Sequence, residues 1–153
     1  FRRVLFRSNK FRHAILLLAF IVGFTAYAQH SHPLLGIWQQ EMITQEGNRI
    51  LIPVWKIISG DGTFSVILMT KDDGRTVQTI EGNYVINSDK TYTEQVKTNV
   101  FDPQQKNTTN TLNYSFDTPD RLRISYHLQG RSVPAIESWQ RVKLENPFPQ
   151  NDK

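Results

Sequence analysis

The amino-acid sequence predicts an all-β protein, a single antiparallel meander β-barrel of about eight to ten strands. Apolar and polar residues alternate along most of the chain, and no stretch of about twelve residues keeps the apolar spacing of a helix. Gly, Asp, Asn and Pro interrupt the alternation about every eight to twelve residues, as turns do between the short strands of a sandwich or a barrel. The chain has no cysteine, so the domain must be stabilised by burial alone, and a closed sheet also removes exposed strand edges.

The N-terminal segment is expected to lie outside this domain. Residues 1–8 look like a fragment end, because no pattern joins them to the rest of the chain. Residues 9–28 have the three parts of a secretory signal peptide: a basic start, an apolar run and an Ala-x-Ala cleavage site. The apolar run, of about eleven residues, is shorter than the roughly 20 that a membrane-spanning helix needs. We therefore expect a barrel domain of residues 29–153 that is periplasmic or secreted, with no membrane span after cleavage.

The charge balance excludes one class of partner. Removal of the expected signal peptide and the residues before it takes away five of the 18 basic residues and none of the 14 acidic ones. The remaining domain is close to neutral. Because nucleic-acid binding requires a retained basic patch, we expect no nucleic-acid partner.

Five strands are expected in the first part of the domain. They are apolar or alternating runs bounded by turn residues, at 35–43, 50–59, 63–70, 75–81 and 83–86. Pro53 cannot donate a ladder hydrogen bond, so it indicates a bulge or an edge-like gap in the ladder of the second strand. Asp-Gly pairs at 61–62 and 73–74 are typical of tight hairpin turns. Gly82 suggests a sharp bend between the fourth strand and the fifth.

Four more strands are expected in the second part. They span 91–98, 109–116, 121–128 and 135–143. In the second of these, Leu112, Tyr114 and Phe116 alternate with polar neighbours, which is the pattern of a half-buried strand. The longer segment 99–108 is expected to be a loop, and the proline-bearing residues 144–153 to be frayed.

No catalytic motif is present in the expected domain. It has no cysteine nucleophile and no Gly-x-Ser-x-Gly sequence. Its histidines are His30, His32 and His127; the first two lie in a polar lead-in without a third metal ligand nearby, and the third is expected on the surface. The sequence therefore predicts a non-enzymatic protein with no catalytic residue, metal or cofactor.

A binding function requires only an apolar interior with a few polar anchors. Strand alternation indicates a set of inward-facing candidates: Trp55, Phe64, Tyr84, Tyr92, Glu94, Tyr114, Glu137 and Trp139. Glu137 and Arg141 share a strand face with Trp139, and an outward orientation of Glu137 also stays open. Two interpretations of the charged members stay open: they anchor a ligand, or they form one internal ion pair that fixes the register of the barrel.

The first and last strands carry a further pattern. Gly36-Ile37-Trp38 opens the first strand, and Arg141 lies near the end of the last one. This arrangement resembles the Gly-x-Trp signature of lipocalin-like barrels, the calycin superfamily. The resemblance implies that Arg141 packs over Trp38 where the barrel closes, a cation–π contact of about 0.5–2 kcal/mol. The runs 60–64 and 82–94 also resemble small secreted lipocalin-like domains of uncharacterised function from Gram-negative bacteria.

The resemblance to the large lipocalins is incomplete. The chain lacks their disulfides and C-terminal helix, and it lacks the helical lid of the fatty-acid-binding branch. We therefore expect a binding barrel for a small hydrophobic or amphipathic molecule, without the classical ligands of either branch. The alternative is an envelope or extracellular module that binds a protein or glycan, with a barrel filled by side chains and with loop 99–108 as the contact.

Overall fold

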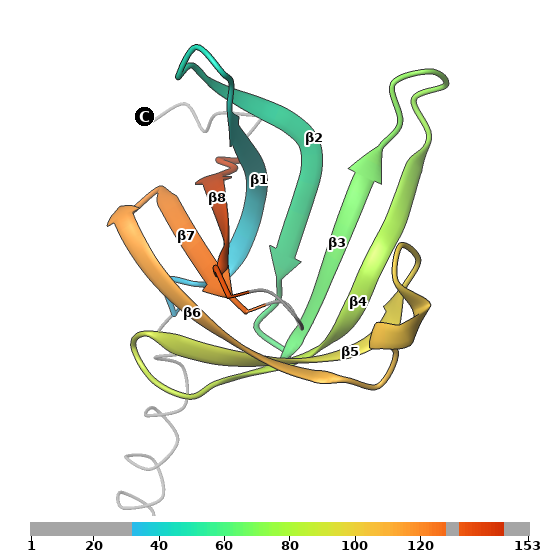
Figure 1. Ribbon diagram of the computed structural model, residues 1–153, viewed down its shortest axis with the longest axis vertical. Coiled ribbons are helices and arrows are strands. Elements are labelled where there is room, and N and C mark those ends of the chain that lie inside the picture. The colour runs from blue at the N-terminus through green and yellow to red at the C-terminus, as the bar shows by residue number, and fades with distance from the viewer. Residues whose placement is uncertain (1–31, 128–131, 146–153) are drawn as a thin grey trace, which may run out of the picture. The chain divides into compact units, whose positions relative to one another are not determined.

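Eight antiparallel strands form one closed barrel in a computed structural model, which describes residues 32–127 and 132–145 (Figure 1). The strands pair in sequence order, and β1 also pairs with β8. Their bounds are β1 Gly36–Ile43, β2 Arg49–Ile58, β3 Thr63–Met69, β4 Thr76–Ile86, β5 Thr91–Asn99, β6 Thr109–Thr118, β7 Arg121–Tyr126 and β8 Ala135–Arg141. A single 3-10 turn, η1 at Pro103–Gln105, interrupts the loop between β5 and β6. The predicted meander barrel is confirmed. The expected signal peptide at 9–28 and the residues before it lie outside the described residues.

The strand count differs from the nine expected runs. Residues 75–81 and 83–86 were expected as two strands, but they form the single strand β4. Gly82 lies inside it, at a shift of register against β5. A Cβ atom at Gly82 would come 2.1 Å from the carbonyl oxygen of Gln95 and 2.7 Å from the Phe64 ring. The glycine therefore allows a close approach of the neighbouring strand and does not end β4.

The predicted bulge at Pro53 is confirmed. The pairing of β1 with β2 shifts from Gln39 opposite Trp55 to Glu41 opposite Leu51, so Pro53 lies in the irregular stretch of β2. Pairing of β2 with β3 begins only after it, at Val54. The missing N–H of the proline thus costs no regular ladder hydrogen bond.

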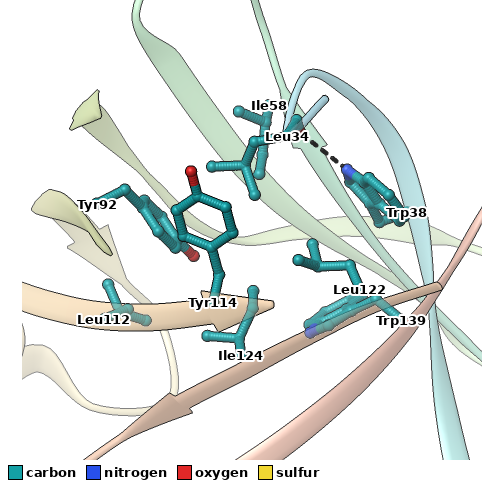
Figure 2. Packing of buried hydrophobic residues seen from close by; sticks show 9 residues of the cluster. All are labelled: Leu34, Trp38, Ile58, Tyr92, Leu112, Tyr114, Leu122, Ile124 and Trp139. Atoms are coloured by element: carbon teal, nitrogen blue, oxygen red, sulfur yellow. Dashed lines mark hydrogen bonds between the residues drawn. The ribbon is translucent and has the colours of Figure 1, made fainter. Parts of the chain in front are cut away.

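Closure of the barrel brings Trp38 and Arg141 together, as predicted. They are direct partners in the β1–β8 pairing, and the Arg141 guanidinium carbon lies 4.0 Å from the centre of the Trp38 ring. The indole is fully buried, and its Nε1 donates to the carbonyl of Leu34 at 2.9 Å (Figure 2). Arg141 Nη1 donates to the carbonyl of Leu35 at 2.8 Å, and Nη2 donates to that of Pro33. One side chain thus covers the indole and holds the segment that precedes β1.

The contact between Arg141 and Trp38 explains why a glycine occupies position 36. Its φ angle is +132°, and a Cβ atom there would lie 2.8 Å from Arg141 Nη1. A side chain would strain the backbone and push the guanidinium away from Trp38. The Gly-x-Trp pattern and the distant arginine therefore form one structural unit.

The hydrophobic core fills the end of the barrel near the start of β1. It consists of side chains with at most 5% exposure: Leu34, Trp38, Ile58, Tyr92, Leu112, Tyr114, Leu122, Ile124 and Trp139 (Figure 2). Edge-to-face contacts join Tyr114 to Tyr92 and to Phe116, with ring centres 5.9 and 5.8 Å apart. We call this the closed end of the barrel. Within the described residues, no helix has the length and apolar character needed to cross a membrane.

Candidate functional site

The opposite end of the barrel, which we call the mouth, is more open to solvent. On β1, exposure of the side chains on the inward face rises from 0% at Trp38 through half-buried Gln40 to 48% at Met42. On β2, Ile58 and Lys56 are buried, whereas Val54, one step nearer the mouth, is half-buried. The inward face thus changes from a packed core to an accessible wall along the barrel axis.

The inward face of β2 differs from the sequence prediction at one residue. Lys56 pairs with Trp38 on one side and with Val66 on the other, and all three are buried. Trp55 therefore faces outward, where it is only half-buried. The sequence prediction that Trp55 lies in the barrel interior is therefore wrong. The run 50–58 is apolar on both strand faces, so its alternation alone does not identify the inward one.

Lys56 forms an ion pair inside the barrel. Its Nζ lies 2.5 Å from Oε1 of Glu94, and the two residues are 4% and 7% exposed. The Tyr92 hydroxyl donates to the same oxygen at 2.9 Å. The ammonium also lies over aromatic rings, 5.2 Å from the centre of Phe64 and 6.0 Å from that of Trp139. A carboxylate and a set of rings thus compensate the buried positive charge.

The protonation of Lys56 is fixed by its surroundings. Burial by itself lowers the pKa of Lys56, but the nearby Glu94, Tyr92 and Glu137 more than offset this effect, so its pKa is raised overall. Burial also raises the pKa of Tyr92, whose hydroxyl stays a neutral donor. A lysine nucleophile or base needs the neutral amine. Lys56 is therefore a fixed positive charge.

Glu137 is the second carboxylate of the interior. It pairs with Ile124 across β7 and β8, on the same face as Trp139, and it is half-buried. Its Oε1 accepts from the Tyr126 hydroxyl at 2.8 Å, and its Oε2 accepts from Trp139 Nε1 at 3.1 Å. Burial and the adjacent Glu137 raise the pKa of Tyr126. Two neutral donors thus hold this carboxylate, one on each oxygen.

The expected internal ion pair exists, but with a different cation. Arg141 lies at the closed end, where its Nε is 3.8 Å from Asp120, and it does not reach the interior carboxylates. Lys56 takes that place, and sequence reasoning missed it. The sequence did contain a signal for it, because Lys56 is a single charged residue in an otherwise apolar strand run close to Pro53.

Two predicted interior tyrosines reach the turns of the closed end. The Tyr84 hydroxyl donates to the carbonyl of Ser59 at 2.7 Å, and the Tyr114 hydroxyl donates to that of Ser88 at 2.9 Å. Burial raises the pKa of both. Their hydroxyls fasten turns to the barrel wall and make no hydrogen bond to the charged groups, although Tyr84 is the cross-strand partner of Glu94 and the Tyr114 ring packs against Tyr92. His127 is exposed, as predicted.

The candidate site, which we call the interior cluster, extends from the packed core toward the mouth and joins three charged side chains to three aromatic hydrogen-bond donors: Lys56, Glu94, Glu137, Tyr92, Tyr126 and Trp139. It brings together four of the predicted residues, adds Lys56 and Tyr126, and leaves Trp55, Tyr84 and Tyr114 outside. Phe64 contributes the ring under the ammonium. In the described ranges, no three His, Cys, Asp or Glu side chains come together as a metal site would require. The arrangement suits the orientation of a bound molecule.

Comparison with known proteins identifies the family. The family model described as a domain of unknown function (DUF4488) matches residues 33–150, which include every strand of the barrel. No curated protein matches the chain. Because the matched region is well over half of the sequence, the chain belongs to the DUF4488 family.

Proposed function

We propose that this protein is an exported, non-catalytic, lipocalin-like barrel that binds one small, partly apolar ligand in its interior. The observation that carries the proposal is the half-buried Glu137, held by Tyr126 and Trp139 on the mouth side of the packed core. A few placed polar groups in an apolar wall are typical of small-molecule sites. An eight-stranded barrel has room for one such molecule when side chains do not fill it.

Stability alone gives no reason for this polar interior. Replacement of a buried ion pair by apolar residues of similar volume is often neutral or stabilising. A barrel that served only as a rigid support would be at least as stable with apolar residues in place of Lys56 and Glu94. Their presence supports a role in recognition.

The remaining parts of the proposal have separate support. The Gly36, Trp38 and Arg141 unit supports the likeness to lipocalin-like barrels. The signal-peptide pattern at residues 9–28 supports export to the periplasm or beyond. The protonated state of Lys56 supports binding without catalysis, because it keeps this interior amine from acting as a nucleophile.

Tryptophan fluorescence tests the proposal directly. Trp139 donates to Glu137, so a ligand at the interior cluster should change its emission. The purified protein would be titrated with lipids, bile acids, haem and aromatic metabolites. Trp55→Phe should keep the response, because Trp55 lies on the outer wall, and Trp139→Phe should lose most of it. The absence of saturable binding for every compound, measured also by calorimetry, would refute the proposal.

A second candidate function is binding of an envelope or extracellular protein or glycan through the β5–β6 loop. In this loop Val100 and Phe101 are 54% and 71% exposed. Asn99 and Asp102 fix its shape by accepting backbone hydrogen bonds, so it is a defined surface on a rigid scaffold. A pull-down from the cell envelope that returns the same proteins with Phe101→Ser as with wild type would refute this candidate.

A further inference from the structure

The interior cluster has an unequal number of positive and negative groups. It contains one ammonium, on Lys56, and two carboxylates, on Glu94 and Glu137. The first carboxylate has its counter-ion at 2.5 Å. Among residues 32–127 and 132–145, no Lys or Arg forms a salt bridge with Glu137. Among the described residues, the cluster therefore has one more carboxylate than cations, and the half-buried Glu137 is the carboxylate without a cation at salt-bridge distance.

The two carboxylates also differ in access. Glu94 is 7% exposed, with its cation and the Tyr92 hydroxyl on the same oxygen. Glu137 is half-buried and lies nearer the mouth. A carboxylate has about four acceptor positions, and its two described donors use two of them. Glu137 can thus accept further hydrogen bonds from a group that enters through the mouth.

The surroundings of Glu137 favour a cation with an apolar body. The hydroxyl of the half-buried Tyr126 and the indole N–H of Trp139 point at the carboxylate, so both rings lie beside the place where a cation would bind. The walls towards the mouth are apolar, with Val54 and Leu68 half-buried on β2 and β3. These features match an amine on an aliphatic or aromatic chain.

An anionic ligand fits the same place poorly. Its natural partner would be Lys56, which is 4% exposed and already paired with Glu94. Binding an anion there would require the ligand to displace a buried carboxylate and to lie near a second one. Both effects disfavour fatty acids and other carboxylates relative to amines.

We infer that the ligand of this barrel carries a protonated amine, which Glu137 receives as an ion pair and hydrogen bond while the apolar part of the ligand lies against the wall below the mouth. This inference rests on the proposed ligand-binding function and specifies its chemical class. Lys56 and Glu94 then form the fixed polar floor beneath the amine site. Tyr126 and Trp139 are positioning residues that orient the Glu137 carboxylate.

Calorimetric titration with three matched probes tests the inference. Octylamine, octanol and octanoate share a chain and differ in head group, so at neutral pH they are cationic, neutral and anionic. The wild-type protein should bind octylamine more tightly than the other two. In Glu137→Gln the affinity for octylamine should fall by about 30-fold or more, since a desolvated charge pair is lost, while the affinity for octanol should change little.

The glutamine variant keeps the shape of the side chain and one acceptor for its two donors, and its folding would be checked by near-ultraviolet circular dichroism. Glu81→Gln is the matched control, because Glu81 pairs with Ser65 on the outer face of β4 and should leave all three affinities unchanged. The preference for octylamine in the wild-type protein provides a test that needs no variant.

Each outcome distinguishes the two proposals. Equal binding of the three probes, or tighter binding of octanol or octanoate, would overturn the amine inference and leave ligand binding intact. A preference for octylamine that persists in folded Glu137→Gln would overturn the assignment to Glu137. Failure of all three probes, together with failure of the fluorescence panel, would overturn both the inference and the proposed function.

Discussion

Removal of the buried ammonium is the most informative perturbation of the interior cluster. Lys56→Met keeps an unbranched apolar side chain, one atom shorter, and removes the charge. Glu94, 7% exposed, would retain the Tyr92 hydroxyl and lose its counter-ion. Breaking a buried pair from one side costs about 3–5 kcal/mol, because the remaining charge stays desolvated and unpaired. In a domain of this size the loss corresponds to a fall of about 10–20 °C in Tm.

The double variant Lys56→Met/Glu94→Gln separates the two contributions. It removes both charges of the pair, so Glu94 no longer leaves an unpaired buried charge, and it should be more stable than Lys56→Met alone. The free energy of unfolding would be measured by urea denaturation, with a check that the m-value is unchanged. Lys97→Met is the matched control: Lys97 is exposed on β5, and its loss should change stability by no more than about 0.5 kcal/mol. A cost below about 1 kcal/mol for Lys56→Met, or strict additivity in the double variant, would refute the buried-pair reasoning.

Two further predictions concern the closed end and the pH range. Trp38→Ala should lower the free energy of unfolding by about 3–5 kcal/mol, and Arg141→Ala should lower it by less. The double variant should lose about 0.5–3 kcal/mol less than the sum of the two single losses. Strict additivity in urea unfolding would contradict the stacked pair. The pKa of Lys56, Tyr92 and Tyr126 is raised in the folded protein, so stability that is fully present below about pH 10 should be lost as the pH rises past the unfolded-state values. Urea midpoints should therefore fall above about pH 10 and fall less steeply in Tyr126→Phe, and a midpoint independent of pH in that range would contradict this account.

The strands of the barrel could be predicted because they depend on local and repeated features. Alternating runs between turn residues specify antiparallel strands without any knowledge of their partners. The contact of Trp38 with Arg141 follows once the sheet closes, because closure makes the first and last strands neighbours. The division of β4 at Gly82 was wrong, since a glycine that ends a strand and one that admits a neighbouring backbone look the same in sequence.

The composition of the candidate site could be predicted only in part. Alternation groups Glu94 with Tyr92 and Glu137 with Trp139, which made both carboxylates candidates for the interior, but an outward Glu137 stayed open. The run of β2 is apolar on both faces, and the Pro53 bulge changes its register against β1. A shift of one residue turns every side chain to the other face, so sequence reasoning selected Trp55 where the barrel places Lys56.

Alternation and turn residues were thus enough to predict the fold class and most of the aromatic interior, and the likeness to lipocalin-like barrels added the closing contact. The assembled barrel was needed to show that Lys56 neutralises Glu94 and that, among the described residues, Glu137 has neutral donors alone. Charge pairing inside a barrel depends on which faces of β2, β5 and β8 meet across the interior. Bulges, strand tilt and closure determine which strand faces lie opposite one another, and each of these is a property of the assembled sheet.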